Sequence, residues 1–210
     1  MLPYPVKETL RYIKKIASVA RKTSAVVLEH LWDPDYIRWH IGHSHKLLKF
    51  KDIHKNQSCF IIGNGPSLNE MDLRPLNRYY TFGLNKIYLL FNKVDLNLTY
   101  HVAVNPFVIQ QSIDAFQKLN CISFLSYRPA RSRIKNAKNV HFIETRGAYT
   151  FHTDLTRSIH EGYTVTFVAL QIAFYMGFKT VYLIGIDHNF VAQGKPNETQ
   201  ILRGADLNHF

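Results

Sequence analysis

Short apolar runs separated by helix-like segments constrain the fold of this 210-residue chain more than any other feature. Apolar runs that we interpret as buried strands lie at 58–62, 80–84, 100–104, 121–125, 140–143 and 180–186. The apolar stretch 165–176 is long enough for a helix and follows Thr164, a candidate N-cap. Strands that alternate with helices are typical of an α/β protein, so we predict a doubly wound, mostly parallel, Rossmann-like sheet.

The charge of the chain is unevenly distributed. Residues 1–56 contain 11 Lys or Arg and 5 Asp or Glu, so more than half of the formal net charge of +11 lies there. Apolar residues recur at helical spacing over 6–31, with basic residues between them. We therefore predict a basic amphipathic helical extension over 1–55 and an α/β domain over 56–210. The extension would dock on its own domain, on a second copy in a homo-oligomer, or peripherally on an anionic membrane.

Composition excludes several classes of protein. Hydrophobic residues make up 46% of the chain, which excludes intrinsic disorder, and no apolar run approaches the ~18 residues of a membrane span. The start lacks the features of a secretory signal, so we expect a cytoplasmic protein, peripheral at the inner membrane surface if the extension binds lipid. No nucleic-acid recognition motif accompanies the charge.

Cys59 and Cys121 sit in apolar runs and should be buried free thiols. His40, His43 and His45 lack ligand spacing, so we expect packing histidines and no metal site.

A glycine turn follows the first predicted strand. Gly63 and Gly65 belong to the segment GNGPSL, and Ser67 and Glu70 have the spacing of a capping box, which predicts a helix beginning at Ser67. A strand, a glycine turn and a helix N-terminus together form the general anion-binding arrangement, in which glycines let a ligand approach the backbone. The segment matches neither the P-loop nor the dinucleotide fingerprint. It therefore favours a mononucleotide or sugar-nucleotide site, the alternative being a plain tight turn.

Polar residues follow several predicted strands. In doubly wound sheets, ligands bind beyond the carboxyl ends of the strands. Asn is also common in turns for local reasons, so the alternative is a set of unrelated turns. We favour a single site, formed by Asn64, Asn85, Asn105, Asp187, His188 and Asn189.

Residues 57–210 resemble a known family. The matching segments resemble the MptE-like domain family, named for an archaeal 6-hydroxymethylpterin diphosphokinase, and are similar to the bacterial sialyltransferases of glycosyltransferase family 42. The resemblance also implies that the domain continues beyond Phe210 in its relatives. The matching segments are GNGPSL at 63–68, GLNKIYLLF at 83–91, VAVN at 102–105, the stretch 161–190 that contains GIDHNF, and NHF at 208–210.

The resemblance implies roles for individual residues. His209 takes the position of the catalytic base, and His188 or Arg203 would assist the departing phosphate. From its own chemistry, Asp187 would orient a base or bind ribose, the alternative being an Asp that closes a strand-to-loop turn. Histidine suits a base because its pKa lies near working pH. In the sialyltransferases, the GNGPS turn and the next Asn contact the CMP donor. This implies contacts from Asn64, Ser67 and Asn85 here, and a further donor contact aligns with Val165, which Thr164 and Thr166 flank. Together with the glycines and the strand-end residues, our candidate nucleotide-binding residues are Gly63, Asn64, Gly65, Ser67, Asn85, Asn105, Thr164, Thr166 and Asn189.

Three functions remain open from the sequence. The first is a glycosyltransferase of surface-glycan synthesis, which transfers a sugar from a CMP-sugar donor to a glycan acceptor and requires no cofactor. The second is an MptE-like diphosphokinase that uses ATP and Mg²⁺, with Asp187 and Asp206 as metal ligands. The third is a non-catalytic module that binds a nucleotide at the same turn.

Overall fold

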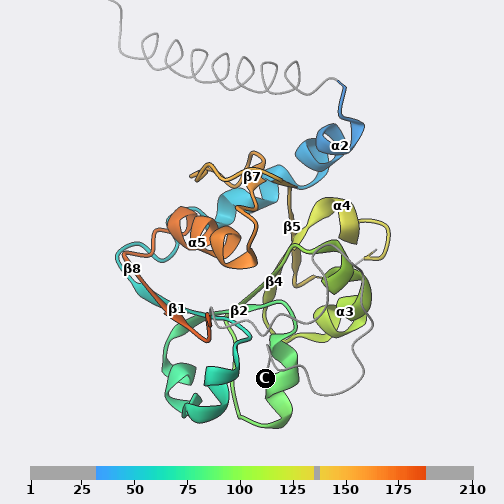
Figure 1. Ribbon diagram of the computed structural model, residues 1–210. Coiled ribbons are helices and arrows are strands. Elements are labelled where there is room, and N and C mark those ends of the chain that lie inside the picture. The colour runs from blue at the N-terminus through green and yellow to red at the C-terminus, as the bar shows by residue number, and fades with distance from the viewer. Residues whose placement is uncertain (1–31, 135–137, 188–210) are drawn as a thin grey trace, which may run out of the picture.

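A computed structural model describes residues 32–134 and 138–187 of the chain (Figure 1). Most of the predicted basic extension, including 6–31, lies outside the described residues. The helical elements are α2 (Pro34–Gly42), η1 (Ser44–Phe50), η2 (Pro66–Glu70), η3 (Arg74–Arg78), η4 (Ile87–Asn92), α3 (Pro106–Lys118), α4 (Tyr127–Ala130) and α5 (Val165–Tyr175). The strands are β1 (Ser58–Ile62), β2 (Tyr80–Leu84), β3 (Tyr100–Ala103), β4 (Ile122–Ser126), β5 (Val140–Ile143), β6 (Thr145–Arg146), β7 (Ile159–His160) and β8 (Thr180–Ile184).

Six of the strands form one parallel sheet. Their order is β5-β4-β3-β2-β1-β8, and β6 pairs with β7 in a small separate ladder. Ile62 of β1 pairs with Gly83 of β2 on one side and with Ile184 of β8 on the other. The chain therefore runs outward from β1 to β5 and then returns to the far side of β1. This all-parallel arrangement confirms the predicted doubly wound, Rossmann-like fold.

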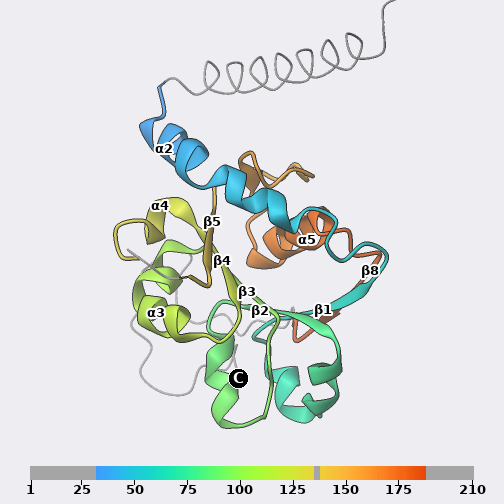
Figure 2. The same ribbon diagram turned by 180° about the vertical axis from the view of Figure 1, so that it is seen from behind.

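Helical elements cover both faces of the sheet. Figures 1 and 2 show α5 and η1 on one face, and η2 to η4 with α3 on the other. The elements η2 to η4 enclose a smaller apolar cluster that includes Ile62, Leu68 and Ile87. The connections after β1 and β2 are short 3₁₀ helices. The helix predicted to begin at Ser67 is present as η2, but it is a five-residue 3₁₀ helix that begins at Pro66 and has Gly65 as its N-cap.

Helix α5 matches its predicted span closely and lies in the core. The Thr164 hydroxyl accepts a hydrogen bond from the amide of Phe167 at 3.1 Å, which confirms the predicted N-cap. The helix is apolar almost all round, as expected for a helix enclosed on most sides. Its buried Gln171 accepts a hydrogen bond from the His152 amide and donates one to the His160 carbonyl, so it ties the 150–160 loop to the helix.

The described start of the chain packs into the same core as the sheet. Tyr36 and Trp39 of α2 and Phe50 of η1 are buried in the main apolar cluster. The Trp39 indole donates a 2.9 Å hydrogen bond to the Phe142 carbonyl. The His43 ring packs edge-on against Phe142 at 4.9 Å, and burial is the main reason why its pKa is lowered. Residues 34–50 are thus held by the α/β core and are not a separate layer.

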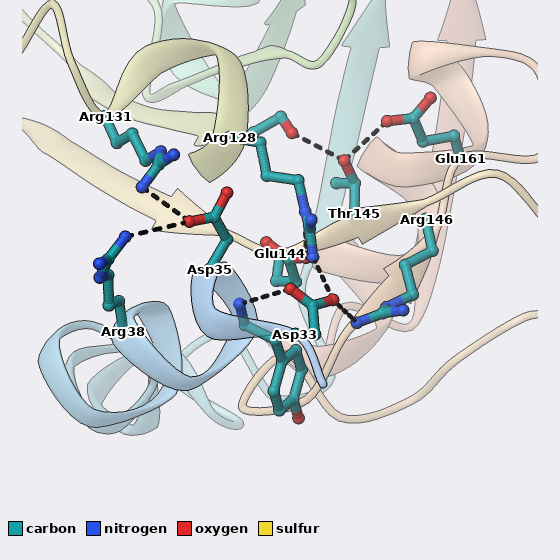
Figure 3. Close-up of polar contacts among 11 residues, drawn as sticks. Asp33, Asp35, Arg38, Arg128, Arg131, Glu144, Thr145, Arg146 and Glu161 are labelled. Carbon is teal, nitrogen blue, oxygen red and sulfur yellow. Dashed lines mark hydrogen bonds and ion pairs between the residues drawn. The ribbon is translucent and has the colours of Figure 1, made fainter. Parts of the chain in front are cut away.

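Figure 3 shows an ion-pair cluster that fixes α2 against the ends of β4 and β5. Arg128 contacts both Asp33 and the fully buried Glu144, each at 2.6 Å, and Arg146 contacts Asp33 at 2.8 Å. Burial by itself would raise the pKa of Asp33, but hydrogen bonds from Arg128, the Tyr36 amide and Arg146 lower it to about 2. The cluster lies at the carboxyl ends of β4 and β5, at one end of this edge of the sheet.

Both cysteines are free thiols as predicted, but only Cys59 is fully buried. Cys59 is buried, Cys121 is half-buried, and neither forms a disulfide. Burial raises the pKa of both thiols to about 12, so they are protonated at neutral pH. Within residues 32–134 and 138–187, no helix is both long and apolar enough to cross a membrane.

Candidate functional site

The sheet reverses its winding direction between β1 and β8. The chain leaves β1 toward β2 on one side, whereas β8 returns on the other, so the loops after β1 and β8 lie side by side. The Gly63 amide donates to the Ile184 carbonyl and the Gly65 amide to the Gly185 carbonyl, both at 2.9 Å. In doubly wound sheets such a switch point is where ligands bind.

The glycines of the turn are required by this loop-to-loop contact. A Cβ atom on Gly63 would lie 2.2 Å from the Gly185 carbonyl oxygen, and one on Gly65 would lie 2.3 Å from the Asp187 carboxylate. Gly185 itself has a φ of +62°. We expected these glycines to make room for a ligand at the backbone. The structure gives a different reason, since the space beside each Cα is filled by the loop that follows β8.

Ser67 and Asp187 are bonded to each other. The Ser67 amide and hydroxyl both donate to the Asp187 carboxylate, at 2.9 and 2.6 Å. The predicted capping box was wrong, because no side chain of its own segment caps η2. The Ser67 amide instead donates to the carboxylate of Asp187, which lies 120 residues away in the sequence. Asp187 therefore joins the β8 loop to the glycine turn.

An open cleft of about 540 Å³ lies over this edge of the sheet. It gathers residues that follow β1, β2, β3 and β8 together with the segment that leads into α5. The cleft brings together most of the described residues that the sequence singles out, although Ser67 does not line it. Its lining includes Gly63, Asn64, Gly65, Asn85, Asn105, Glu161, Tyr163, Thr164, Thr166 and Asp187.

Two amide side chains in the cleft have oxygens without a partner. The Oδ1 atoms of Asn64 and Asn85 are buried and accept no hydrogen bond from the described part of the chain. A buried acceptor left unsatisfied costs about 1–3 kcal/mol. Both asparagines line the same cleft, so one bound molecule with suitably spaced N–H or O–H donors would satisfy both oxygens.

Asn85 is held by a buried histidine that the sequence analysis did not identify. Asn85 has a φ of +49°, a left-handed conformation that Asn tolerates better than most residues. Its carbonyl accepts a 2.8 Å hydrogen bond from Nε2 of the fully buried His101, whose Nδ1 lies 3.2 Å from the Ser123 hydroxyl. Burial lowers the pKa of His101 to about 4, so the ring is neutral at pH 7 and donates from Nε2.

The N-termini of two helices also border the cleft. Asn105 is the N-cap of α3 and accepts hydrogen bonds from the amides of Phe107 and Val108 at 2.9 and 3.2 Å. Thr164 caps α5 in the same way, and Thr166 lies in its first turn. A helix N-terminus carries a partial positive charge that favours anions. The Asn105 side-chain oxygen is already used by its own helix, unlike those of Asn64 and Asn85.

Glu161 and Tyr163 are cleft residues that the sequence analysis did not select. The Thr145 hydroxyl donates a 2.6 Å hydrogen bond to Oε1 of Glu161 and lies 2.8 Å from the Ser126 hydroxyl (Figure 3). Tyr163 is 84% exposed and has a φ of +64°. No local sequence pattern marks either residue, because both reach the cleft through a turn with two left-handed residues.

The described residues offer no metal centre. Within 32–134 and 138–187, no three His, Cys, Asp or Glu side chains come together in a way that would hold a metal ion. Asp187, a candidate ligand for Mg²⁺, accepts two hydrogen bonds from Ser67. The other sequence-based candidates, His188, Asn189, Arg203, Asp206 and His209, lie outside the described residues.

The fold and cleft define a doubly wound α/β protein with its candidate site at the switch point. The family model described as "6-hydroxymethylpterin diphosphokinase MptE-like" matches residues 39–193, and the chain belongs to this family. A solved structure, the MAf glycosyltransferase from Magnetospirillum magneticum AMB-1, is 18% identical with a TM-score of 0.47. That match covers 84% of this chain and 33% of the glycosyltransferase, so the chain spans about a third of that protein. No curated protein matched the chain.

Proposed function

We propose that the chain is a transferase that binds the nucleotide part of an activated sugar, with a CMP-sugar as the favoured donor, in surface-glycan synthesis. The observation that carries this proposal is the pair of unpartnered oxygens of Asn64 and Asn85 in one switch-point cleft. Amide oxygens accept hydrogen bonds from the amino groups of bases and the hydroxyls of ribose. The N-termini of α3 and α5 would favour the phosphate.

The proposed reaction is transfer of the sugar to an acceptor hydroxyl. The acceptor oxygen forms a bond to the anomeric carbon, and the bond from that carbon to the phosphate oxygen breaks. The nucleotide leaves with the electron pair, and a base takes the acceptor proton. His209 and His188 remain our candidates for this base. Glu161 is a further candidate, because its carboxylate lines the cleft and is oriented by Thr145.

In this scheme Asp187 has a structural role in the glycine turn. Its carboxylate accepts both hydrogen bonds that Ser67 donates, so we assign it to holding the β1 and β8 loops together. Ser67 would then shape the turn without contacting the nucleotide. Asn64 belongs to the β1 loop, between two glycines whose amides donate to carbonyls at the end of β8, and this would keep its side chain directed into the cleft.

The family description favours a second candidate, a diphosphokinase that transfers diphosphate from ATP to a hydroxymethylpterin. This reaction would use Mg²⁺, for which Asp187 and Asp206 are the candidate ligands. Asp187 would have to give up its hydrogen bonds to Ser67 to bind a metal, which makes it a poor fit as it stands. We therefore rank this activity second.

A ligand screen separates these functions. The thermal unfolding midpoint is measured with CMP-, UDP-, GDP- and ADP-linked sugars and with ATP plus Mg²⁺. A ligand at 100 times its Kd adds about 2.7 kcal/mol, which for a chain of this size raises the Tm by about 5–10 °C. A shift with CMP-sugars and release of CMP on adding acceptor glycans support the proposal. A shift with ATP and Mg²⁺ alone would replace the proposal by the diphosphokinase. Nucleotide binding without turnover would replace it by the non-catalytic binding module.

A further inference from the structure

The turn that leads into α5 places a tyrosine in an unfavourable backbone conformation. Gly162 and Tyr163 have φ values of +51° and +64°, and the Thr164 amide closes the turn by donating to the Glu161 carbonyl at 2.9 Å. The left-handed region is disfavoured for residues with a Cβ atom, and glycine would adopt it without this cost. Strain of this kind gathers at functional sites.

The Tyr163 ring gains little from its surroundings. It is 84% exposed, and its nearest aromatic neighbour is Tyr149, whose ring centroid lies 6.3 Å away at an interplanar angle of 28°. Tyr149 is itself 75% exposed. The pair therefore adds no buried core to offset the strain. Tyr163 lines the cleft that also contains the unpartnered oxygens of Asn64 and Asn85.

We propose that Tyr163 is the surface on which the base of the bound nucleotide stacks, an inference that rests on the proposed function. Among the described residues the ring has one aromatic neighbour, Tyr149, so its exposed surface offers a flat face to a planar ligand. A base presents such a face and carries polar groups on its edge. With the base over Tyr163, those edge groups can face the amide oxygens of the cleft. The phosphate would then lie toward the N-terminus of α5, which begins two residues later at Val165.

The test compares ligands with and without a base. Binding of CMP, UMP, AMP, GMP and ribose 5-phosphate is measured by calorimetry with the wild-type chain and with Tyr163→Ala, Tyr163→Phe and Tyr163→Gly. Loss of base stacking should weaken nucleotide binding about five- to a hundredfold in Tyr163→Ala and Tyr163→Gly. Tyr163→Phe should bind like the wild type, and ribose 5-phosphate should bind equally to all variants. Tyr149→Ala is the matched control and should weaken binding less than Tyr163→Ala.

Thermal unfolding guards against misfolded variants. Tyr163→Gly should unfold at a higher temperature than Tyr163→Ala, because glycine relieves the strain at this φ, while both lose nucleotide affinity. Unchanged CMP binding by Tyr163→Ala, or an equal loss of CMP and ribose 5-phosphate binding, would overturn the inference alone. If the wild-type chain bound none of the nucleotides, the proposed function and this inference would both be overturned.

Discussion

The carboxyl edge of the sheet is closed at one end and open at the other. Beyond β4 and β5, helix α2 covers the strand ends, and Asp33, Arg128, Glu144 and Arg146 pair there as opposite charges. Beyond β1, β2 and β8, no helix covers the strand ends in the described part of the chain, and a cleft of about 540 Å³ remains. We call the strand ends beyond β4 and β5 the closed half of this edge, and those beyond β1, β2 and β8 the open half.

The difference lies in how polar groups are satisfied. In the closed half, the fully buried Glu144 needs a partner, because an unpaired buried charge costs several kcal/mol, and Arg128 supplies it. Two atoms there, Glu144 Oε2 and Arg146 Nε, accept or donate no hydrogen bond within the described residues, but both side chains are ion-paired through Oε1 and an Nη2 atom. In the open half, the unpartnered groups are the neutral amides of Asn64 and Asn85, which have no ion pair and whose cost is smaller. The closed half should thus control stability and the open half should control binding. The hydroxyls of Ser126 and Thr145 and the carboxylate of Glu161 form a chain of hydrogen bonds that connects the two.

Arg128→Ala should give the largest effect on stability. The change leaves Asp33 and the buried Glu144 without their shared partner, so we expect the free energy of unfolding to fall by about 3 kcal/mol. Denaturant unfolding measures this loss. Arg131→Ala is the matched control, since Arg131 pairs with Asp35 near the surface and should cost less than about 1 kcal/mol. Equal losses in the two variants would refute the contrast between the two halves.

Acid should destabilise the protein through His101. Burial lowers the pKa of His101 to about 4, below its ordinary value of 6.5, so the folded state resists protonation. The contribution of His101 to stability is complete above pH 6.5 and falls by about 3 kcal/mol as the pH drops to 4. Unfolding free energies measured across this range should have a shallower slope in His101→Gln, whose amide can replace Nε2. An identical slope would contradict this assignment.

The sequence predicted the parts of the fold that local patterns determine. The apolar runs gave the six strands of the main sheet, and Thr164 with the apolar stretch after it gave α5. Strand alternation with helices was sufficient to predict the parallel sheet, because that connectivity has few alternatives. The gathering of Asn64, Asn85 and Asp187 at one edge followed from the same topology.

Contacts between distant segments could not be predicted in this way. The capping box at Ser67 was overridden by Asp187, and the reason for the glycines at 63 and 65 is the loop after β8. His101 lies inside a strand and has no local mark of its contact with the Asn85 carbonyl. Tyr163 reaches the cleft only through its left-handed backbone. Each of these features depends on tertiary structure that a local pattern does not contain.

Asn64→Ala should affect binding and leave stability nearly unchanged. The Asn64 oxygen accepts no hydrogen bond from the described residues, so its removal breaks none there. If it accepts one from the nucleotide, affinity should fall about tenfold, equivalent to the ~1.4 kcal/mol of a lost hydrogen bond. Calorimetry with CMP measures the affinity, and denaturant unfolding checks that the fold is intact. Unaltered affinity in a stable variant would remove Asn64 from the site.

Asn105→Ala should show the opposite behaviour, although both residues are asparagines at strand ends lining one cleft. The Asn105 oxygen already accepts hydrogen bonds from the Phe107 and Val108 amides, so its loss removes the N-cap of α3. We expect about 1 kcal/mol lower stability and less than a threefold change in CMP affinity. The pair of variants thereby separates a capping asparagine from a ligand-binding one. If Asn105→Ala lost affinity as strongly as Asn64→Ala, an unpartnered oxygen would not be what distinguishes binding residues in the open half.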